Sequence, residues 1–165
     1  MTKSVNSQET SKIITLESSD KIEFKVDENV VRISTLCCVM CEDDIDDTDD
    51  NIPILNVEGK TLGKIIEYCT HYVSDKMPDI QKPLPNTDFN KIVGDWYADY
   101  IDVSISELMD IINGANYMDI QPLLDLGCAK SASLIKGKTP DEIKEFFSVN
   151  TPHYNFKKKT KLIYN

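Results

Sequence analysis

The chain has 165 residues and a net charge of −10, and because its last fifteen residues hold four lysines and no acid, the first 150 residues carry −14. A chain this acidic argues against nucleic-acid binding, which requires a basic face to meet the phosphates. No apolar run approaches the roughly 20 residues that cross a bilayer, so we expect neither nucleic acid nor a membrane as a partner.

A β-hairpin is predicted near the start of the chain, after a polar stretch (residues 1–11) that we expect to be disordered. Residues 21–27 alternate polar and apolar side chains with the period of two of a half-buried strand. The apolar face of this strand would consist of Ile22, Phe24 and Val26. We expect residues 14–16 to pair with it through a turn at residues 18–20.

The next elements are a short helix, an acidic loop and a second strand. Residues 33–42 are apolar enough for a short helix, whereas residues 42–50 contain seven acids in nine positions and cannot pack in a core. Residues 52–57 are strand-like, and Pro53, which has no N–H to donate, places this strand at the edge of a sheet.

A helical region follows. Residues 61–72 form an amphipathic helix with one apolar stripe, made of Leu62, Ile65, Ile66 and Cys69. Residues 74–90 are rich in Pro, Asp, Asn and Lys and indicate a loop. Trp96, Tyr100 and Ile101 then share a helical face. Ser104 and Glu107 have the spacing of a capping box, and the helix that they open would bury Leu108, Met109, Ile111, Ile112 and Ala115.

The last two predicted helices meet at a sharp corner. Gly137 is suited to end the helix that starts near Gln121. Thr139 then offers an N-cap hydroxyl, Pro140 fits the first helical position, and Glu142 completes a capping box. These helices contain many apolar residues and little chain remains to cover them, so we expect an exposed patch of the kind that marks a partner site.

Two motifs resemble metal sites. Cys38 and Cys41 form a C-x-x-C motif, but Cys69 and Cys128 do not supply a second pair at zinc spacing, so we favour core packing for these thiols. The acidic loop imitates a calcium site when counted from Asp47, through Asp49 and Asn51 to Glu58. Because Ile52 stands where that turn needs glycine, we favour a solvated loop and expect no metal or cofactor.

No catalytic constellation is evident. His71 and His153 are the two histidines, and neither lies in a recognisable nucleophile motif. Gly59, Gly63 and Gly94 stand singly rather than in a phosphate-binding loop. We therefore expect no catalytic residues and no enzymatic activity.

Five strings in order carry a family resemblance: residues 16–20, 52–57, 68–71, 114–120 and 135–143. With them, the chain from Ile13 to about Val149 resembles the S-phase-kinase-associated protein 1 family, the adaptors that join F-box proteins to a cullin in SCF ubiquitin ligases. The resemblance implies an α/β (α+β) fold, in which a BTB/POZ-like domain with a small mixed sheet flanked by helices precedes C-terminal F-box-binding helices.

The resemblance also implies a function and its residues. The chain would be a non-catalytic adaptor, with Asn116 and Tyr117 facing the cullin. The F-box interface would consist of Leu123, Leu124, Leu134, Ile135, Ile143, Phe147 and Val149. Pro140 matches a proline that is hydroxylated and glycosylated in some protist relatives, so it is a possible modification site.

The chain departs from the family in two places. Gly127, Ala129 and Ser131 replace larger residues of the F-box helix, and a glycine inside a helix costs about 1 kcal/mol. After Val149 the family continues with an acidic loop and a last helix ending in tryptophan, whereas residues 151–165 here are basic. This tail either misdescribes the native sequence or marks a divergent member with weaker F-box binding.

From these observations we expect four segments: a disordered N-terminus (1–11), a POZ-like cullin-binding domain (12–120), an F-box-binding extension (121–150) and an atypical basic tail (151–165). The alternative is a self-associating POZ-fold or elongin-C-like protein that has lost F-box binding and forms a homodimer when unbound. Five cysteines without a signal-peptide core indicate reduced thiols, and hence cytoplasm and nucleus.

Overall fold

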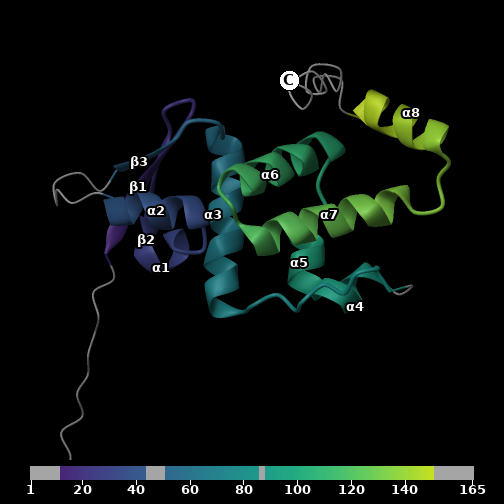
Figure 1. Ribbon diagram of the computed structural model, residues 1–165, viewed down its shortest axis with the longest axis horizontal. Coiled ribbons are helices and arrows are strands. Elements are labelled where there is room, and N and C mark those ends of the chain that lie inside the picture. The colour runs from purple at the N-terminus through teal and green to yellow at the C-terminus, as the bar shows by residue number, and fades with distance from the viewer. Residues whose placement is uncertain (1–11, 44–50, 86–87, 151–165) are drawn as a thin grey trace, which may run out of the picture. The chain divides into compact units, whose positions relative to one another are not determined.

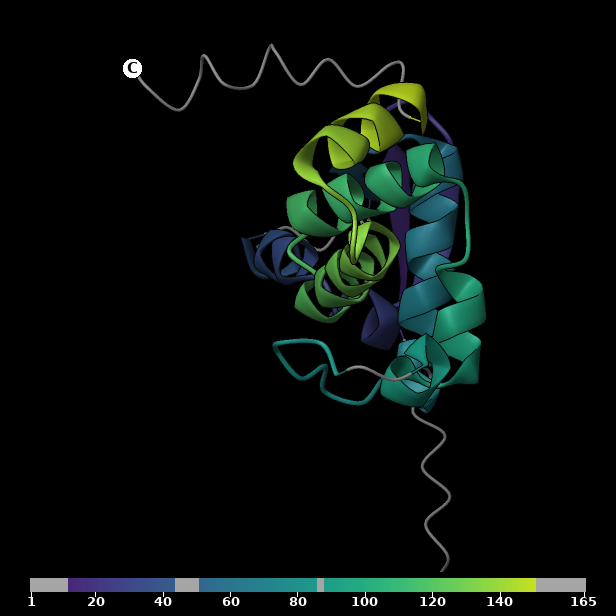
Figure 2. The same ribbon diagram turned by 90° about the vertical axis from the view of Figure 1, so that its right-hand side faces the viewer.

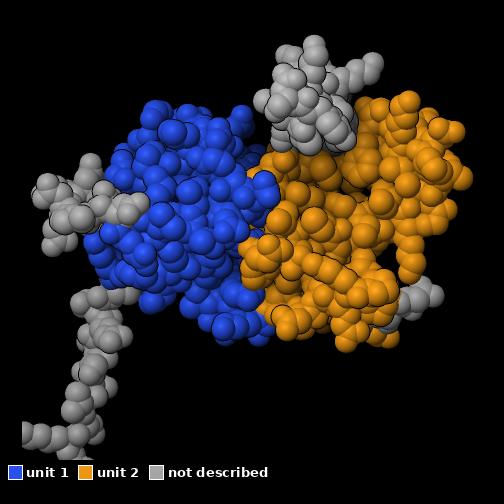
Figure 3. All heavy atoms as spheres, viewed as in Figure 1, with its two compact units in different colours: residues 1–76, 114–120 blue, residues 77–113, 121–165 orange. Residues whose placement is uncertain are grey.

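A computed structural model describes residues 12–43, 51–85 and 88–150 of the chain. These residues belong to two compact units, which Figure 3 distinguishes by colour. Unit 1 consists of Met1–Lys76 and Gly114–Ile120, and unit 2 of Met77–Asn113 and Gln121–Asn165. The units thus divide the chain differently from the four predicted segments, because residues 77–113 cluster with the helices that follow residue 120 rather than with the sheet.

Unit 1 contains a three-stranded mixed sheet (Figure 1). Its strands are β1 (Ile13–Ser18), β2 (Glu23–Asp27) and β3 (Asn51–Ile54), in the order β2-β1-β3. The predicted hairpin is confirmed, since β1 and β2 are antiparallel and Leu16 lies opposite Phe24. β3 is parallel to β1 and occupies an edge, as Pro53 predicts, although the strand ends at Ile54 rather than at residue 57.

The hairpin turn corrects one sequence prediction. Ile22 precedes β2 and is 46% exposed, so it does not share the buried face of the strand with Val26. Ile22 instead covers Gly59, where an added Cβ would come within 2.5 Å of the Ile22 Cδ1 atom. Asp20 ties the same region together, because its Oδ1 atom accepts hydrogen bonds from Ser18 Oγ at 2.6 Å and from the Gly59 N–H at 2.7 Å.

Among the described residues, three whole helices belong to unit 1: α1 (Glu28–Val31), α2 (Thr35–Asp43) and α3 (Gly59–Ser74). α3 runs alongside β1 and β2 (Figure 2). Its predicted apolar stripe is confirmed at three of four positions. Leu62, Ile65 and Cys69 are buried, and Ile66 is half-buried. Tyr68, which the stripe did not include, is fully buried as well.

α2 agrees with the helix predicted for residues 33–42, but it starts two residues later, and its cysteines have different environments. Cys37 is fully buried, so core packing holds for this thiol. Cys38 and Cys41, the two thiols of the C-x-x-C motif, are only half-buried. The core-packing interpretation therefore holds only in part for the motif, because α2 turns Cys38 and Cys41 partly toward solvent.

Unit 2 is helical. It contains α4 (Phe89–Val93), α5 (Asp95–Tyr100), α7 (Gln121–Ile135), α8 (Pro140–Asn150) and most of α6 (Ile105–Tyr117), whose last turn belongs to unit 1. The sequence indicates α5 to α8 but misses α4, a single helical turn and a half that follows the predicted loop. The Trp96 and Tyr100 rings on α5 stack with their centroids 5.2 Å apart.

α6 and α7 lie side by side (Figure 1), and a glycine makes their close approach possible. A Cβ added to Gly127 of α7 would stand 2.5 Å from Cγ1 of Ile112 on α6. Lys130 also connects elements of unit 2, since its Nζ atom pairs with Asp102 at 2.9 Å and lies over the Phe89 ring at 5.6 Å. Gly127 is thus a packing residue and not merely a weak point in the helix.

Candidate partner-binding surfaces

The end of α6 carries the first pair of predicted site residues. Asn116 is exposed and Tyr117 half-buried, and the chain turns sharply after them at Asp119, whose φ is 52°. The turn is held by the segment before α2, because the buried Ser34 Oγ donates a hydrogen bond of 2.6 Å to the Met118 carbonyl. The structure therefore presents this pair on a turn that is anchored in the core of unit 1.

Backbone hydrogen bonds reinforce this anchor. The Thr35 N–H donates to the Asp119 carbonyl at 3.3 Å, and the Leu36 N–H donates to the Met118 carbonyl at 3.4 Å. Both donors belong to the first turn of α2, whose N–H groups have no partners within the helix. The turn after α6 satisfies them, so the geometry of α2 and the position of Asn116 and Tyr117 are linked.

The corner between α7 and α8 has the predicted capping box. Gly137 adopts φ 77°, a left-handed conformation that favours glycine and ends the helix. The Thr139 N–H donates to Glu142 Oε2 at 2.7 Å, and the Glu142 N–H donates to Thr139 Oγ1 at 3.3 Å. Hydrogen bonding of the Glu142 carboxyl by Thr139, through the backbone N–H first and the side chain second, lowers the pKa of that carboxyl. Pro140 opens α8 and is exposed.

α8 has apolar side chains but buries none of them. Ile143, Phe146 and Phe147 are half-buried, and Val149 is 71% exposed. The Phe146 and Phe147 rings meet edge to face at 5.5 Å, and Lys138 Nζ lies 5.5 Å from the Phe146 centroid. The predicted interface did not include Phe146, although its position three residues after Ile143 is a helical spacing that identifies the same face.

The remaining predicted residues are on α7 and differ in exposure. Leu134 and Ile135, at its C-terminal end, are half-buried, as is Leu124 near its start. Leu123 has no exposed surface and packs in the core of unit 2. A side chain without exposed surface cannot contact a partner while α7 is folded, so we leave Leu123 out of the candidate surface.

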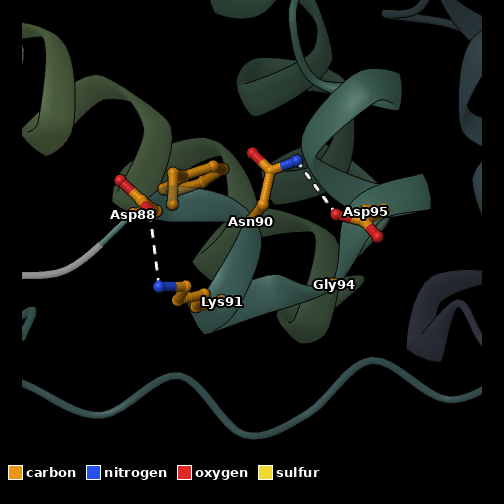
Figure 4. A pocket seen from close by; sticks show the side chains of 6 residues that line it. Asp88, Asn90, Lys91, Gly94 and Asp95 are labelled. Atoms are coloured by element: carbon orange, nitrogen blue, oxygen red, sulfur yellow. Dashed lines mark hydrogen bonds and ion pairs between the residues drawn. The ribbon is translucent and has the colours of Figure 1, made fainter.

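A separate hollow of about 590 Å³ lies in unit 2 (Figure 4). Its lining consists of Asp88, Phe89, Asn90, Lys91, Gly94 and Asp95. The polar groups there bond to one another, since Asn90 Nδ2 donates to Asp95 Oδ1 at 3.1 Å and Lys91 pairs with Asp88 at 3.5 Å. This lining has no histidine, thiol or hydroxyl that could act as a nucleophile or a general base.

Metal ions and membranes are two further classes of partner, and both are considered for residues 12–43, 51–85 and 88–150. There, no group of three or more His, Cys, Asp and Glu side chains is placed to hold a metal ion. Asp47 and Asp49 of the imitated calcium loop lie outside these ranges, while Asn51 is part of β3. No described helix has both the length and the apolar character needed to span a bilayer.

Comparison with known proteins identifies relatives over most of the chain. Residues 12–74 match the tetramerisation domain of the Skp1 family, and residues 121–153 match its dimerisation domain. An S-phase kinase-associated protein 1 homolog from Tetrahymena thermophila is 44% identical over 139 residues, which cover 84% of this chain and 81% of that protein.

Plant and fungal proteins are similar to the chain as well. SKP1-like protein 12 of Arabidopsis thaliana is 41% identical, over 85% of this chain and 86% of the relative. The E3 ubiquitin ligase complex SCF subunit sconC of Neosartorya fischeri is 39% identical, over 82% and 85%. Of the two family matches, the second contains the corner between α7 and α8, and the turn after α6 lies between them.

Proposed function

This chain belongs to the Skp1 family, and we propose that it is the adaptor of an SCF-type E3 ubiquitin ligase, bridging a cullin scaffold to F-box substrate receptors. The observation that carries the proposal is that similarity to SCF subunits extends over more than four fifths of the chain. The adaptor has no chemistry of its own: it holds two partners together so that substrate and ubiquitin-conjugating enzyme come within reach.

The cullin would bind around Asn116 and Tyr117. A tyrosine at an exposed helix end combines an apolar ring with a polar hydroxyl, and this combination is common among residues that dominate interfaces. The anchored turn supports this assignment, because a fixed backbone reduces the conformational entropy that is lost on binding.

The F-box protein would bind α7 and the apolar face of α8. The contact residues would be Leu124, Leu134, Ile135, Ile143, Phe147 and Val149, and we add Phe146 because it lies on the same face. A helix that buries none of its apolar side chains gains little by packing on its own chain, whereas a partner helix would cover them. The two partners would then bind different parts of the chain, since Asn116 and Tyr117 belong to unit 1 and α8 belongs to unit 2.

Separation-of-function variants test this assignment. Ile143→Asp and Phe147→Ala in the full chain should weaken F-box binding by at least about 30-fold, as expected for an anchor worth ~2 kcal/mol, and leave cullin affinity unchanged. Tyr117→Ala should do the reverse. Glu145→Ala on α8 and Thr70→Ala on α3 are matched controls at exposed positions, for which both affinities should stay within about twofold. Variants that reduce both affinities equally would contradict two separate surfaces.

Self-association is the second candidate function, in which a homodimer forms when no F-box protein is bound. It is favoured by the uncovered face of α8 and by the match of residues 121–153 to a domain described as a dimerisation domain. Sedimentation of the purified chain, alone and with an F-box fragment, separates the two. A dimer that persists with the fragment present would favour the second function, and a dimer that the fragment dissociates would support the first.

The proposal also covers the cellular location of the protein and the modification of Pro140. We propose that the adaptor works in the cytoplasm and nucleus, in keeping with five cysteines that are all free thiols. Imaging of the tagged full-length protein in cells checks this location. Pro140 is exposed at the start of α8 and accessible to a hydroxylase, and the intact mass of protein from its native source tests whether it is modified.

A further inference from the structure

α2 carries a pair of half-buried thiols that are neighbours on the surface of the helix. Cys38 and Cys41 stand three residues apart in one helix, so their side chains are neighbours, with Cβ atoms roughly 5–6 Å apart. Both are half-buried, while Cys37 on the same helix is 0% exposed and Cys69 on α3 is 4% exposed. The helix therefore offers to solvent one close pair of thiols, apart from the buried ones.

Charged groups of both signs lie near this pair, since Arg32 is ion-paired with Glu28. The Cys38 Sγ atom donates a hydrogen bond of 3.2 Å to the Arg32 carbonyl. Partial burial raises the pKa of the Cys41 thiol; the positive charges of Arg32 and Lys12 oppose this rise, and the negative charge of Glu28 adds to it. The thiolate is the nucleophile in thiol–disulfide exchange, so the positive charges favour exchange at Cys41 while burial and Glu28 slow it.

Metal binding is the other chemistry of a C-x-x-C motif. A structural zinc site needs four ligands, and within the described part of the chain these thiols are not joined by enough further ligands to form even a group of three. Two neighbouring thiols alone support exchange between dithiol and disulfide.

We propose that Cys38 and Cys41 are a redox site, which forms a reversible disulfide with a small disulfide such as oxidised glutathione and thereby weakens cullin binding. One thiolate attacks the glutathione disulfide, forms a mixed disulfide and releases one reduced glutathione. The second thiolate then attacks the protein sulfur of that mixed disulfide and releases the other glutathione. Two protein thiols are oxidised, and one glutathione disulfide is reduced to two thiols.

The link to the cullin rests on the proposed function. A disulfide draws the two Cβ atoms to about 3.8 Å, closer than neighbouring positions of a helix, so its formation distorts α2. The contacts between α2 and the turn after α6 include the bonds of 3.3 and 3.4 Å from Thr35 and Leu36 to the carbonyls of Asp119 and Met118. These long bonds are lost most easily, and their loss weakens the anchor of the turn after Asn116 and Tyr117, to which the Ser34 Oγ–Met118 bond of 2.6 Å still contributes.

The chemical step is tested with the full chain carrying Cys128→Ser, which removes the exposed cysteine of α7. After incubation with oxidised glutathione, we expect a loss of about 2 Da, the two thiol hydrogens, with peptide mapping that joins Cys38 to Cys41. In the same background, Cys38→Ser and Cys41→Ser should stop at the mixed disulfide with glutathione. A disulfide that instead uses Cys37 or Cys69, or no intramolecular disulfide at all, would overturn the inference.

The regulatory step is tested by the affinity of the reduced and oxidised chain for a cullin N-terminal domain. We expect roughly tenfold weaker binding after oxidation, within the usual range of coupling between two sites, and recovery on reduction. Cys41→Ser should bind equally well before and after glutathione treatment. If the reduced chain does not bind the cullin, the proposed function fails; if reduced and oxidised chains bind equally, the regulatory inference fails and the proposed function stands.

Discussion

Gly63 and Gly127 both lie inside helices, but their surroundings predict opposite effects of a methyl group. A Cβ at Gly63 would be 3.5 Å from Phe24, an ordinary contact, whereas a Cβ at Gly127 would be 2.5 Å from Cγ1 of Ile112. We expect Gly63→Ala to stabilise the protein by about 0.5–1 kcal/mol, since alanine favours the helix. Gly127→Ala should destabilise it by roughly 1–3 kcal/mol through overpacking.

Urea unfolding of the two variants beside the unmodified chain measures this contrast. Because both substitutions are Gly→Ala in a helix, the gain in helix propensity is the same, and any difference reports the close approach of α6 and α7. Equal shifts of the two midpoints would contradict the packing role of Gly127.

Glu142 provides a pH-dependent prediction. Hydrogen bonds from Thr139 lower its pKa below the usual 4.5, so the ionised form favours the folded corner. This contribution is fully present above pH 4.5 and is lost as the pH falls through the lower, folded pKa. Thr139→Ala should move the pKa part of the way back toward 4.5, because the backbone N–H, the larger cause, remains.

An NMR titration of the Glu142 side chain measures both values, with Thr139→Ser as the control that keeps the hydroxyl. A midpoint at or above 4.5 in the unmodified chain would refute the capping box as the source of the shift. Loss of the cap should also lower the helix content of α8, since an N-cap contributes about 1 kcal/mol to its helix.

The residues that sequence reasoning placed correctly are those whose partners are close along the chain. The capping box of Thr139 and Glu142 needs only a spacing of three positions. Ile22 and Gly127 were misjudged because their environment depends on distant residues: Gly59 for Ile22, and Ile112 on another helix for Gly127. A strand period says nothing about a side chain that leaves the strand to cover a glycine.

Among the elements of unit 2, Lys130 of α7 makes contacts through both its charge and its methylene stem, and substitutions can separate these two contributions to stability. Its side chain is 15% exposed, whereas its partner Asp102 is 76% exposed, so the ion pair itself contributes about 0–1 kcal/mol. The buried stem contributes more, roughly 2 kcal/mol for a few methylene groups. Lys130→Met should therefore cost about 1 kcal/mol or less, and Lys130→Ala clearly more.

Lys82 is the matched control for this pair of variants. It forms a similar ion pair with Asp125 at 2.8 Å, but its own side chain is 70% exposed. Lys82→Met and Lys82→Ala should have nearly equal and small effects on the midpoint of urea unfolding. If Lys130→Met destabilises the chain as much as Lys130→Ala, the charge and not the stem holds these elements together.

Elements with a clear period were predictable, and those that rest on long-range packing were not. The alternation of residues 21–27 identifies a strand, and the apolar stripe on α3 identifies a helix, each from a single segment of sequence. α4 has only Phe89–Val93, too short for a helical period, and it lies beside a stretch rich in proline and asparagine. The half-burial of Cys38 and Cys41 could not be predicted from sequence either, because the composition of an apolar helix such as α2 does not indicate which side packs on the core.

At the scale of the whole molecule, the family could be inferred from sequence strings in the right order, and relatives about 40% identical agree with it. The partition into two units could not, because it depends on residues 77–113 clustering with α7 and α8 rather than with their neighbours in sequence. The interface residues stay predictions, for which the structure gives the exposure.

The central claim is that one chain binds a cullin and an F-box protein at the same time. The most direct measurement is size-exclusion chromatography with mass determination of the full chain mixed with a cullin N-terminal domain and an F-box fragment. The account predicts a single complex that contains one copy of each, and its loss when the adaptor is left out. Two binary complexes that exclude one another, or an adaptor that elutes alone or as a homodimer, would contradict it.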